Sequence, residues 1–319
     1  MISFFRIALF IALKALRQYG LYARQVIYSE PTLLATYKGR ELVRLKIYTT
    51  FPMVLFEPSH RFFFQQKVST KLRLACTYVS ILTPLFDDYF ERGEKQVLES
   101  LLLKMKHANE HSEELMLRYY HRLIKQVDQV EQLNTDIADV FEKQQLADLQ
   151  KSTETLTLPQ LEQITREKSA IGFFLILHLT NKPIPEKLAR LIEQLAFLLQ
   201  LGDDIFDLWF DLQEGSQTIA THAADADSLL HYYTQECQRL VELVHDYSSD
   251  KAAVKRFLSY YFFILSRVYV ALKQYQEIDF VAMRQDPKNH RKMLVCDMET
   301  WKNNLKWMTC FNELQTLNR

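Results

Sequence analysis

Apolar residues recur along most of the chain at spacings of three and four, with polar residues between them. This spacing is the period of an amphipathic α-helix, and no segment shows the strict alternation that is typical of a strand. The pattern predicts about ten helices, near residues 3–28, 31–46, 67–92, 94–126, 128–149, 158–180, 185–213, 226–247, 250–275 and 290–315. We expect the stretch 48–63, which contains Pro52 and Pro58, to be the least helical.

Few residues interrupt this pattern. Only six glycines and eight prolines occur among 319 residues. Gly93, Pro183 and Gly215 lie where predicted helices end, and residues 157–163 are typical of a helix start. About ten helices, no strand and 48% hydrophobic residues together predict an all-α protein. We expect a single domain over residues 1–319, in which the helices form a bundle around a central apolar cavity.

Charge and cysteine content narrow the class of protein further. The formal net charge is zero and there is no basic block, so we expect no nucleic-acid partner. The four cysteines form no paired motif, which is typical of reduced thiols in a cytoplasmic protein.

The N-terminal segment, residues 1–30, is apolar but carries Arg6, Lys14 and Arg17. Its uninterrupted apolar run, from Ile7 to Leu13, is too short to span a bilayer, and no clear signal-peptide cleavage site follows. Two interpretations stay open. The segment is either a helix that packs on the core or a helix that lies on a membrane surface through residues 1–20.

Four aspartates interrupt an apolar helix at residues 203–211. Asp203, Asp207 and Asp211 are spaced by four residues, which places them on one helix face, and Asp204 lies beside Asp203. A carboxylate among apolar neighbours is costly unless it is compensated, and a hard cation with oxygen ligands would compensate it. Gly202, directly before Asp203, leaves room for close approach.

A second acidic group and one lysine complete the candidate chemistry. Asp87, Asp88 and Glu91 interrupt another apolar helix, a few residues after Pro84. Lys168 precedes an apolar run and lies 35 residues before Asp203. Taken singly, each feature is also typical of a solvated surface. Together, two acidic motifs on apolar helix faces predict metal-ligand sites that a bundle could bring together.

These motifs resemble those of the class I isoprenoid (terpenoid) synthase superfamily, which includes trans-prenyl diphosphate synthases and class I terpene synthases. The first aspartate-rich motif of that family, DDxx(D/E), looks like Asp87-Asp88-Tyr89-Phe90-Glu91. The second, DDxxDxxxD, matches Asp203, Asp204, Asp207 and Asp211. The family lysine looks like Lys168, so the resemblance covers roughly residues 70–225.

The resemblance implies a fold, a cofactor and a reaction. The fold would be the isoprenoid synthase bundle, and the substrate an allylic prenyl diphosphate. The resemblance also implies Mg²⁺ as the cofactor, with three ions as in the family. The metal ligands would be Asp87, Asp88, Glu91, Asp203, Asp207 and Asp211. The resemblance further implies catalytic roles for Asp87, Asp203 and Lys168, and diphosphate contacts from Lys168, Arg92, Lys288 and Arg291. Ionisation of the substrate would give a cyclic or linear terpene and release diphosphate, which is the reaction of a carbon–oxygen lyase.

Departures from the family pattern keep two alternatives open. Chain elongation needs a second anionic pocket for isopentenyl diphosphate, but Lys38, Arg40 and Arg44 occur in a different order and only Arg92 follows Glu91. The resemblance therefore favours a terpene synthase over a prenyltransferase. The third interpretation is a non-catalytic helical partner subunit. A homodimer and a peripheral membrane contact are further expectations about partners.

Overall fold

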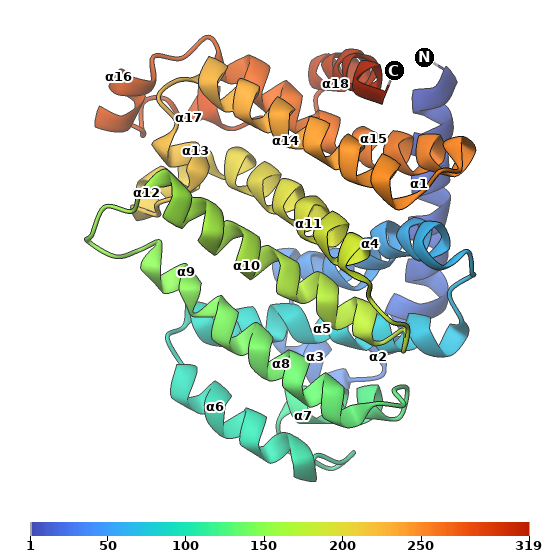
Figure 1. Ribbon diagram of the computed structural model, residues 1–319. Coiled ribbons are helices and arrows are strands. Elements are labelled where there is room, and N and C mark those ends of the chain that lie inside the picture. Colours follow the sequence, from blue (N-terminus) through green and yellow to red (C-terminus); the bar gives the residue numbers. More distant parts are fainter. Residues whose placement is uncertain (1, 319) are drawn as a thin grey trace. The chain divides into compact units, whose positions relative to one another are not determined.

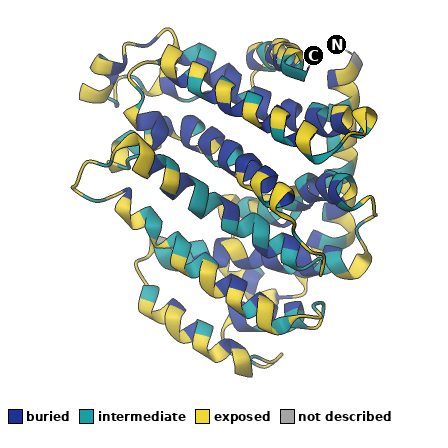
Figure 2. Ribbon diagram, in the orientation of Figure 1, coloured by how far each residue is buried: buried dark blue, intermediate teal, exposed yellow. Residues whose placement is uncertain are grey.

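The computed structural model describes residues 2–318, except the side chains of Ile2 and Glu91 (Figure 1). Within these residues the chain is 79% helical and contains no strand, which confirms the all-α prediction. In the described part of the chain, twelve helices have seven or more residues. Buried and exposed residues form separate stripes along most of these helices, as the sequence pattern predicts (Figure 2).

The longer helices are α1 (Ile2–Gln18), α4 (Gly39–Phe64), α5 (Thr70–Glu91), α6 (Lys95–Lys104), α7 (Leu115–Ile124), α8 (Val130–Gln144), α10 (Leu158–His178), α11 (Glu186–Phe206), α12 (Leu208–Glu214), α14 (Ala226–Tyr247), α15 (Lys251–Tyr275) and α18 (Trp301–Leu314). Short helical segments connect them: the π-helical turn Tyr19–Ala23, α2 (Arg24–Tyr28), α3 (Pro31–Thr36), α9 (Leu146–Leu149), α13 (Ile219–His222), α16 (Phe280–Gln285) and α17 (Arg291–Leu294), with 3₁₀ turns at Met105–His107 and Gln315–Asn318.

The chain divides into two compact units. Unit 1 comprises Met1–Ile7, Asp139–Phe174 and Pro183–Arg319, and unit 2 comprises Ala8–Ala138 and Leu175–Lys182. In unit 1, α11 packs against α14 and α15, and α15 packs against α18. In unit 2, α5 packs against α4 and α7. A single domain over the whole chain stays a prediction.

Aromatic side chains fill the cores of both units. In unit 1 the largest fully buried side chains are Phe197, Tyr233, Tyr261, Phe262, Tyr275 and Phe311. In unit 2 the corresponding residues include Tyr119 and Tyr120. Burial of these side chains, together with the more numerous buried aliphatic residues, supplies the favourable free energy that holds the helices together.

Several predicted helix boundaries are confirmed. Helix α14 has the predicted bounds 226–247, and α15 and α10 differ from prediction by one or two residues at their ends. Gly215 caps α12 and Gly93 follows α5, both at a φ of 70°, where glycine is favoured. Pro183 lies between α10 and α11, also as predicted.

The prediction for residues 48–63 was wrong, because this stretch is the second half of α4 and has Pro52 and Pro58 inside the helix. Each proline removes a helical hydrogen bond, which normally breaks a helix. Here Met53, Val54 and Phe56 are buried, and α4 packs along α5. Packing therefore outweighs the local preference of the two prolines.

The helix expected at 31–46 is interrupted at Tyr37 and Lys38, between α3 and α4. The helices expected at 94–126 and 290–315 are interrupted as well. The helix expected at 94–126 ends after His107 and resumes only at Leu115, and that expected at 290–315 is broken between Leu294 and Trp301. Neither of these last two interruptions contains glycine or proline, so the usual signals of a helix stop are absent from both.

Candidate functional site

The second acidic motif lies in unit 1, where α11 gives way to α12. The predicted helix 185–213 is not continuous, because Asp207 separates α11 from α12 with φ −90° and ψ 7°. The backbone N–H of Asp207 donates to Asp203 O at 2.8 Å, and that of Asp211 donates to Asp207 O at 2.9 Å. These bonds have the helical i to i−4 pattern, so the three aspartates still follow one another at intervals of one turn.

Asp204 is the buried member of this motif. Only 6% of its surface is exposed. Its Oδ1 accepts a hydrogen bond from Gln200 Nε2 at 2.8 Å, whereas its buried Oδ2 has no hydrogen-bond partner. A buried carboxylate oxygen without a donor is unfavourable, and a proton or a cation would satisfy it.

The pKa values of all four carboxylates are raised above their usual value. Burial is the largest cause at each: it raises the pKa of Asp203 and brings that of Asp204 to about 6. The pKa of Asp207 is raised to about 6 by burial and by the charges of Asp203 and Asp204. For Asp211, burial and the charges of Asp204 and Asp207 raise the pKa to about 7. Asp203 and Asp207 keep contact with solvent, so an ion could reach them.

Lys168 is the cation of this site. It lies on α10, is half-buried, and donates to Gln150 Oε1 at 3.3 Å. Its ammonium lowers the pKa values of Asp203, Asp204 and Asp211, opposing the effect of burial. The structure therefore brings together Lys168 and the second acidic motif, two of the features on which the resemblance rests.

Gly202 has a packing role beside this motif. A Cβ atom built on Gly202 would lie 2.8 Å from Val268 Cγ2, closer than side chains normally approach. The room that the glycine leaves is thus occupied by α15. Close contact between α11 and α15 positions the helix end that carries the aspartates.

The C-terminal basic segment lies next to α12. Trp209, between Asp207 and Asp211, donates through Nε1 to Pro287 O at 3.1 Å. The guanidinium of Arg291 lies 5.0 Å from the centre of the Trp209 ring. Lys288 is exposed in the same segment. Sequence reasoning did not identify Trp209 as the anchor, although its position within the motif was a signal.

The first acidic motif lies in unit 2, at the end of α5. Asp88 Oδ1 accepts from Arg44 Nη1 at 2.9 Å, and its Oδ2 accepts from Tyr37 Oη at 2.6 Å. Asp87 Oδ2 lies 3.9 Å from Arg44 Nη2. The pKa of Tyr37 is raised by burial and by its hydrogen bond to Asp88. The Glu91 side chain lies outside the described part of the chain.

Arg44 and Tyr37 are functional candidates that the motif alone did not indicate. The sequence pattern associates Arg44 only with a second diphosphate pocket, whereas in the structure it pairs with the carboxylates of the first motif. Arg92, predicted to contact diphosphate, donates through Nε to Glu94 Oε2 at 3.0 Å and stacks on Tyr89. Its role toward diphosphate stays a prediction.

The side chains of the second motif show whether it could bind a metal ion. Among the described residues, no three His, Cys, Asp or Glu side chains converge so as to hold one ion. Mg²⁺ does not require this, because it is usually bound by one or two carboxylates together with phosphate oxygens and water. The unpartnered oxygen of Asp204 and the raised pKa values of its neighbours fit such a cation. The convergence of the two motifs on a shared site stays a prediction, since they belong to different units.

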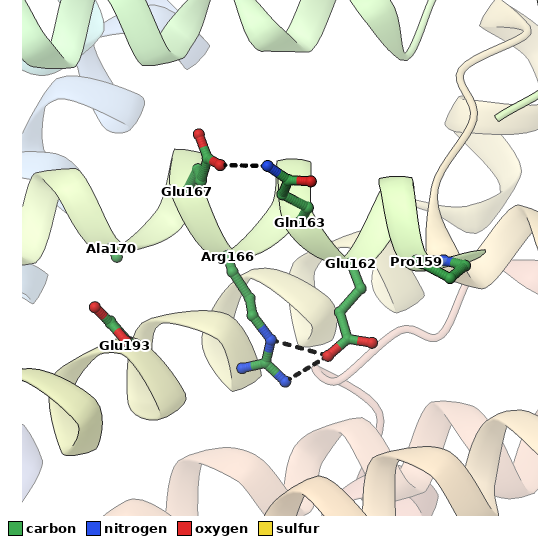
Figure 3. A pocket seen from close by; sticks show the side chains of 7 residues that line it. All are labelled: Pro159, Glu162, Gln163, Arg166, Glu167, Ala170 and Glu193. Atoms are coloured by element: carbon green, nitrogen blue, oxygen red, sulfur yellow. Dashed lines mark hydrogen bonds and ion pairs between the residues drawn. The ribbon is translucent and has the colours of Figure 1, made fainter. Parts of the chain in front are cut away.

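A pocket of about 530 Å³ opens in unit 1 (Figure 3). It is lined by Pro159, Glu162, Gln163, Arg166, Glu167, Ala170 and Glu193. Arg166 donates to Glu162 and Glu236 and lies 3.8 Å from the centre of the Phe197 ring. Because its charge is already neutralised, this arginine is a structural residue rather than a free anion site. The aspartates and Lys168 do not line this pocket.

Comparisons of the chain with models of protein families, with curated proteins and with solved structures found no match.

Proposed function

We propose that this protein is a class I terpene synthase that ionises an allylic prenyl diphosphate within an isoprenoid-synthase-type bundle. The observation that carries the proposal is the group formed by Lys168 and the four aspartates at residues 203–211. A structural role accounts poorly for this group, because Asp204 has a buried oxygen with no partner and three neighbours have raised pKa values. A site for a cation and an anionic ligand accounts for both features.

In this proposal, the acidic residues bind the metal and Lys168 acts on the leaving group. Asp203, Asp207 and Asp211 would hold Mg²⁺ on the second motif, where its charge would also offset the unpartnered oxygen of Asp204. Asp87, Asp88 and Glu91 would hold Mg²⁺ on the first motif. When bound, Mg²⁺ supplies positive charge to the oxygens of the leaving diphosphate. Lys168 would stabilise negative charge on that group as the carbon–oxygen bond breaks.

Residues around this centre have supporting roles in the proposal. Arg291 and Lys288 would contact the diphosphate from the C-terminal segment, which Trp209 fixes beside α12. Arg44 and Tyr37 would hold the Asp88 carboxylate in place before ligand binds. Apolar walls would exclude water from the carbocation, and aromatic faces would stabilise it.

A prenyltransferase is the second candidate function. The DDxxDxxxD form of the second motif favours it. Against it, Arg44 is engaged by Asp87 and Asp88, which leaves fewer basic groups for a second diphosphate pocket. A non-catalytic partner subunit has no specific observation in its favour.

The test is to incubate the purified protein and Mg²⁺ with C10, C15 and C20 allylic diphosphates, each with and without isopentenyl diphosphate. Hydrocarbon or alcohol from the allylic substrate alone supports the terpene synthase. A longer diphosphate that forms only with both substrates supports the prenyltransferase. Absence of turnover with every substrate would contradict both. Asp203→Asn should abolish the reaction, and Asp227→Asn, a change at an exposed aspartate of α14, serves as the matched control.

A further inference from the structure

Helix α1 has one side that packs against the protein and one side that is exposed to solvent, which we call its open side. On the packed side, Gln18 is buried and donates to Thr77 Oγ1 at 2.9 Å, while Lys14 forms an ion pair with Glu57 of α4. These contacts lie within unit 2 and fix the rotation of the helix about its own axis. The interpretation of residues 1–30 as a packing helix is therefore correct for one side of α1.

The open side of α1 is apolar. Leu9, Leu13 and Leu16 expose 61%, 57% and 69% of their surface, and their spacing of four and three residues places them on one stripe. Phe10 and Leu21 are also exposed nearby along the chain. We call Leu9, Leu13 and Leu16 the leucine stripe. Single exposed leucines are ordinary, but three in succession on one helix face mark an interaction surface.

The charged residues of the segment that carries the leucine stripe have one sign. Residues 1–29 contain four basic residues and no acidic residue. Lys14 is paired with Glu57, whereas Arg6, Arg17 and Arg24 are exposed. An apolar stripe bordered by arginines is the pattern of helices that lie in the interface of an anionic membrane.

We propose that the leucine stripe docks onto the surface of an anionic lipid bilayer, with Arg6, Arg17 and Arg24 contacting the headgroups. A second copy of the chain is the competing occupant of this face. A symmetric dimer would apply the same stripe to itself and bring arginines of one sign together, which is unfavourable. An anionic bilayer instead neutralises each of them. Insertion across the bilayer is not an alternative, because no helix in the described part of the chain is long and apolar enough.

The test measures co-sedimentation of the full chain with vesicles, at low and at high salt. We expect binding to vesicles that contain phosphatidylglycerol, weaker binding to phosphatidylcholine alone, and release at high salt. The variant Leu9→Gln/Leu13→Gln/Leu16→Gln should bind at least about 10-fold more weakly. Its matched control is Val97→Gln/Leu103→Gln/Leu149→Gln, which alters exposed apolar residues of α6 and α9 and should bind as wild type.

A second variant keeps the test decisive if the leucine variant unfolds. Arg6→Gln/Arg17→Gln/Arg24→Gln should lose on the order of 100-fold in affinity for anionic vesicles, since each basic residue near the surface contributes about a factor of five. Its control is Lys251→Gln/Lys255→Gln/Arg256→Gln, at the exposed start of α15. Failure of wild type to bind anionic vesicles, or equal binding by wild type and both α1 variants, would overturn the proposal. So would a wild-type dimer that the leucine variant converts to a monomer without any vesicle binding. The proposal does not depend on the proposed reaction.

Discussion

At the level of single residues, Asp204 and Asp211 show why a cluster of carboxylates is unfavourable for the stability of the folded protein. Burial at Asp204 removes solvent from an oxygen that no donor replaces. At Asp211 burial acts together with the charges of Asp204 and Asp207. Lys168 offsets part of this cost but contributes only one positive charge. The protein without a cation therefore carries excess negative charge at the junction of α11 and α12.

The pKa of Asp211 leads to a prediction about stability and pH. Its folded-state pKa of about 7 is above the unfolded value, so its contribution to stability is complete below about pH 4 and is lost as pH rises through about 7. Asp211→Asn cannot ionise and should raise the melting temperature of the metal-free protein at pH 8. We expect a gain on the order of 1 kcal/mol, allowing for solvent screening, and almost none at pH 4.

Thermal melts of wild type and Asp211→Asn across this range, with chelator present, measure the difference. Asp227→Asn, at an exposed aspartate, should show no such dependence on pH. A gain for Asp211→Asn that is equal at pH 4 and pH 8 would contradict the assigned pKa.

Lys168 leads to a kinetic prediction. If its ammonium stabilises the departing diphosphate, Lys168→Ala should lower kcat on the order of 100-fold. Lys168→Arg should recover only part of the rate, because a planar guanidinium does not replace a compact ammonium. Steady-state kinetics on an allylic diphosphate measure both. The control is Lys187→Ala, at an exposed lysine paired with Asp246. An unchanged kcat in Lys168→Ala would show that Lys168 does not take part in the reaction.

At the level of elements, the contact of α11 with α15 decides where the second motif lies. Val268 of α15 occupies the space that a side chain at Gly202 would need. The hydroxyl of Tyr275, near the end of the same helix, lies 2.8 Å from both Ile205 O and Leu294 O and donates its single proton to one of these carbonyls at a time. Helix α15 thus contacts the end of α11 at two places, at Gly202 directly before the aspartate motif and at Ile205 within it.

Gly202→Ala should accordingly destabilise the protein by about 1–3 kcal/mol, because the added methyl group overpacks the contact with Val268. Gly172→Ala is the matched control on α10, where an added Cβ meets nothing within 4 Å. Removing a helical glycine there should stabilise by roughly 0.5–1 kcal/mol. Urea unfolding of both variants gives the two changes, and a Gly202→Ala protein as stable as wild type would contradict the packing role.

At the level of the whole molecule, the two acidic motifs belong to different units, Asp87 to unit 2 and Asp203 to unit 1. The proposed function requires that both contribute to one site. If they do, Mg²⁺ with inorganic diphosphate should stabilise wild type by about 2.7 kcal/mol at a ligand concentration 100-fold above Kd. Asp87→Asn and Asp203→Asn should each lose most of this stabilisation.

The measurement is the shift in melting temperature on adding Mg²⁺ and diphosphate, with Asp227→Asn as control. Loss of the shift in only one of the two variants would show that the motifs do not share a ligand. An equal shift in all four proteins would remove the metal site from both motifs, and with it the main support for the proposed reaction.

The sequence alone determined the all-α class, most helix positions and the identity of the charged groups. The helical period of apolar residues, the residues that start a helix and Gly215, which ends one, act within a few residues of the chain. A short stretch of sequence is therefore enough to recognise each of them. The same holds for the spacing of Asp203, Asp207 and Asp211, which backbone geometry converts into successive turns.

Only the tertiary structure decided the features that depend on residues far apart in the chain. Pro52 and Pro58 lie inside α4 because packing against α5 outweighs their local preference. Lys168 acts on the aspartates, Arg44 pairs with Asp88, and Val268 fills the space beside Gly202, in each case across tens of residues. Hydrophobic periodicity says which face of a helix is buried but not which helix covers it, so these partners follow from packing and not from any local pattern.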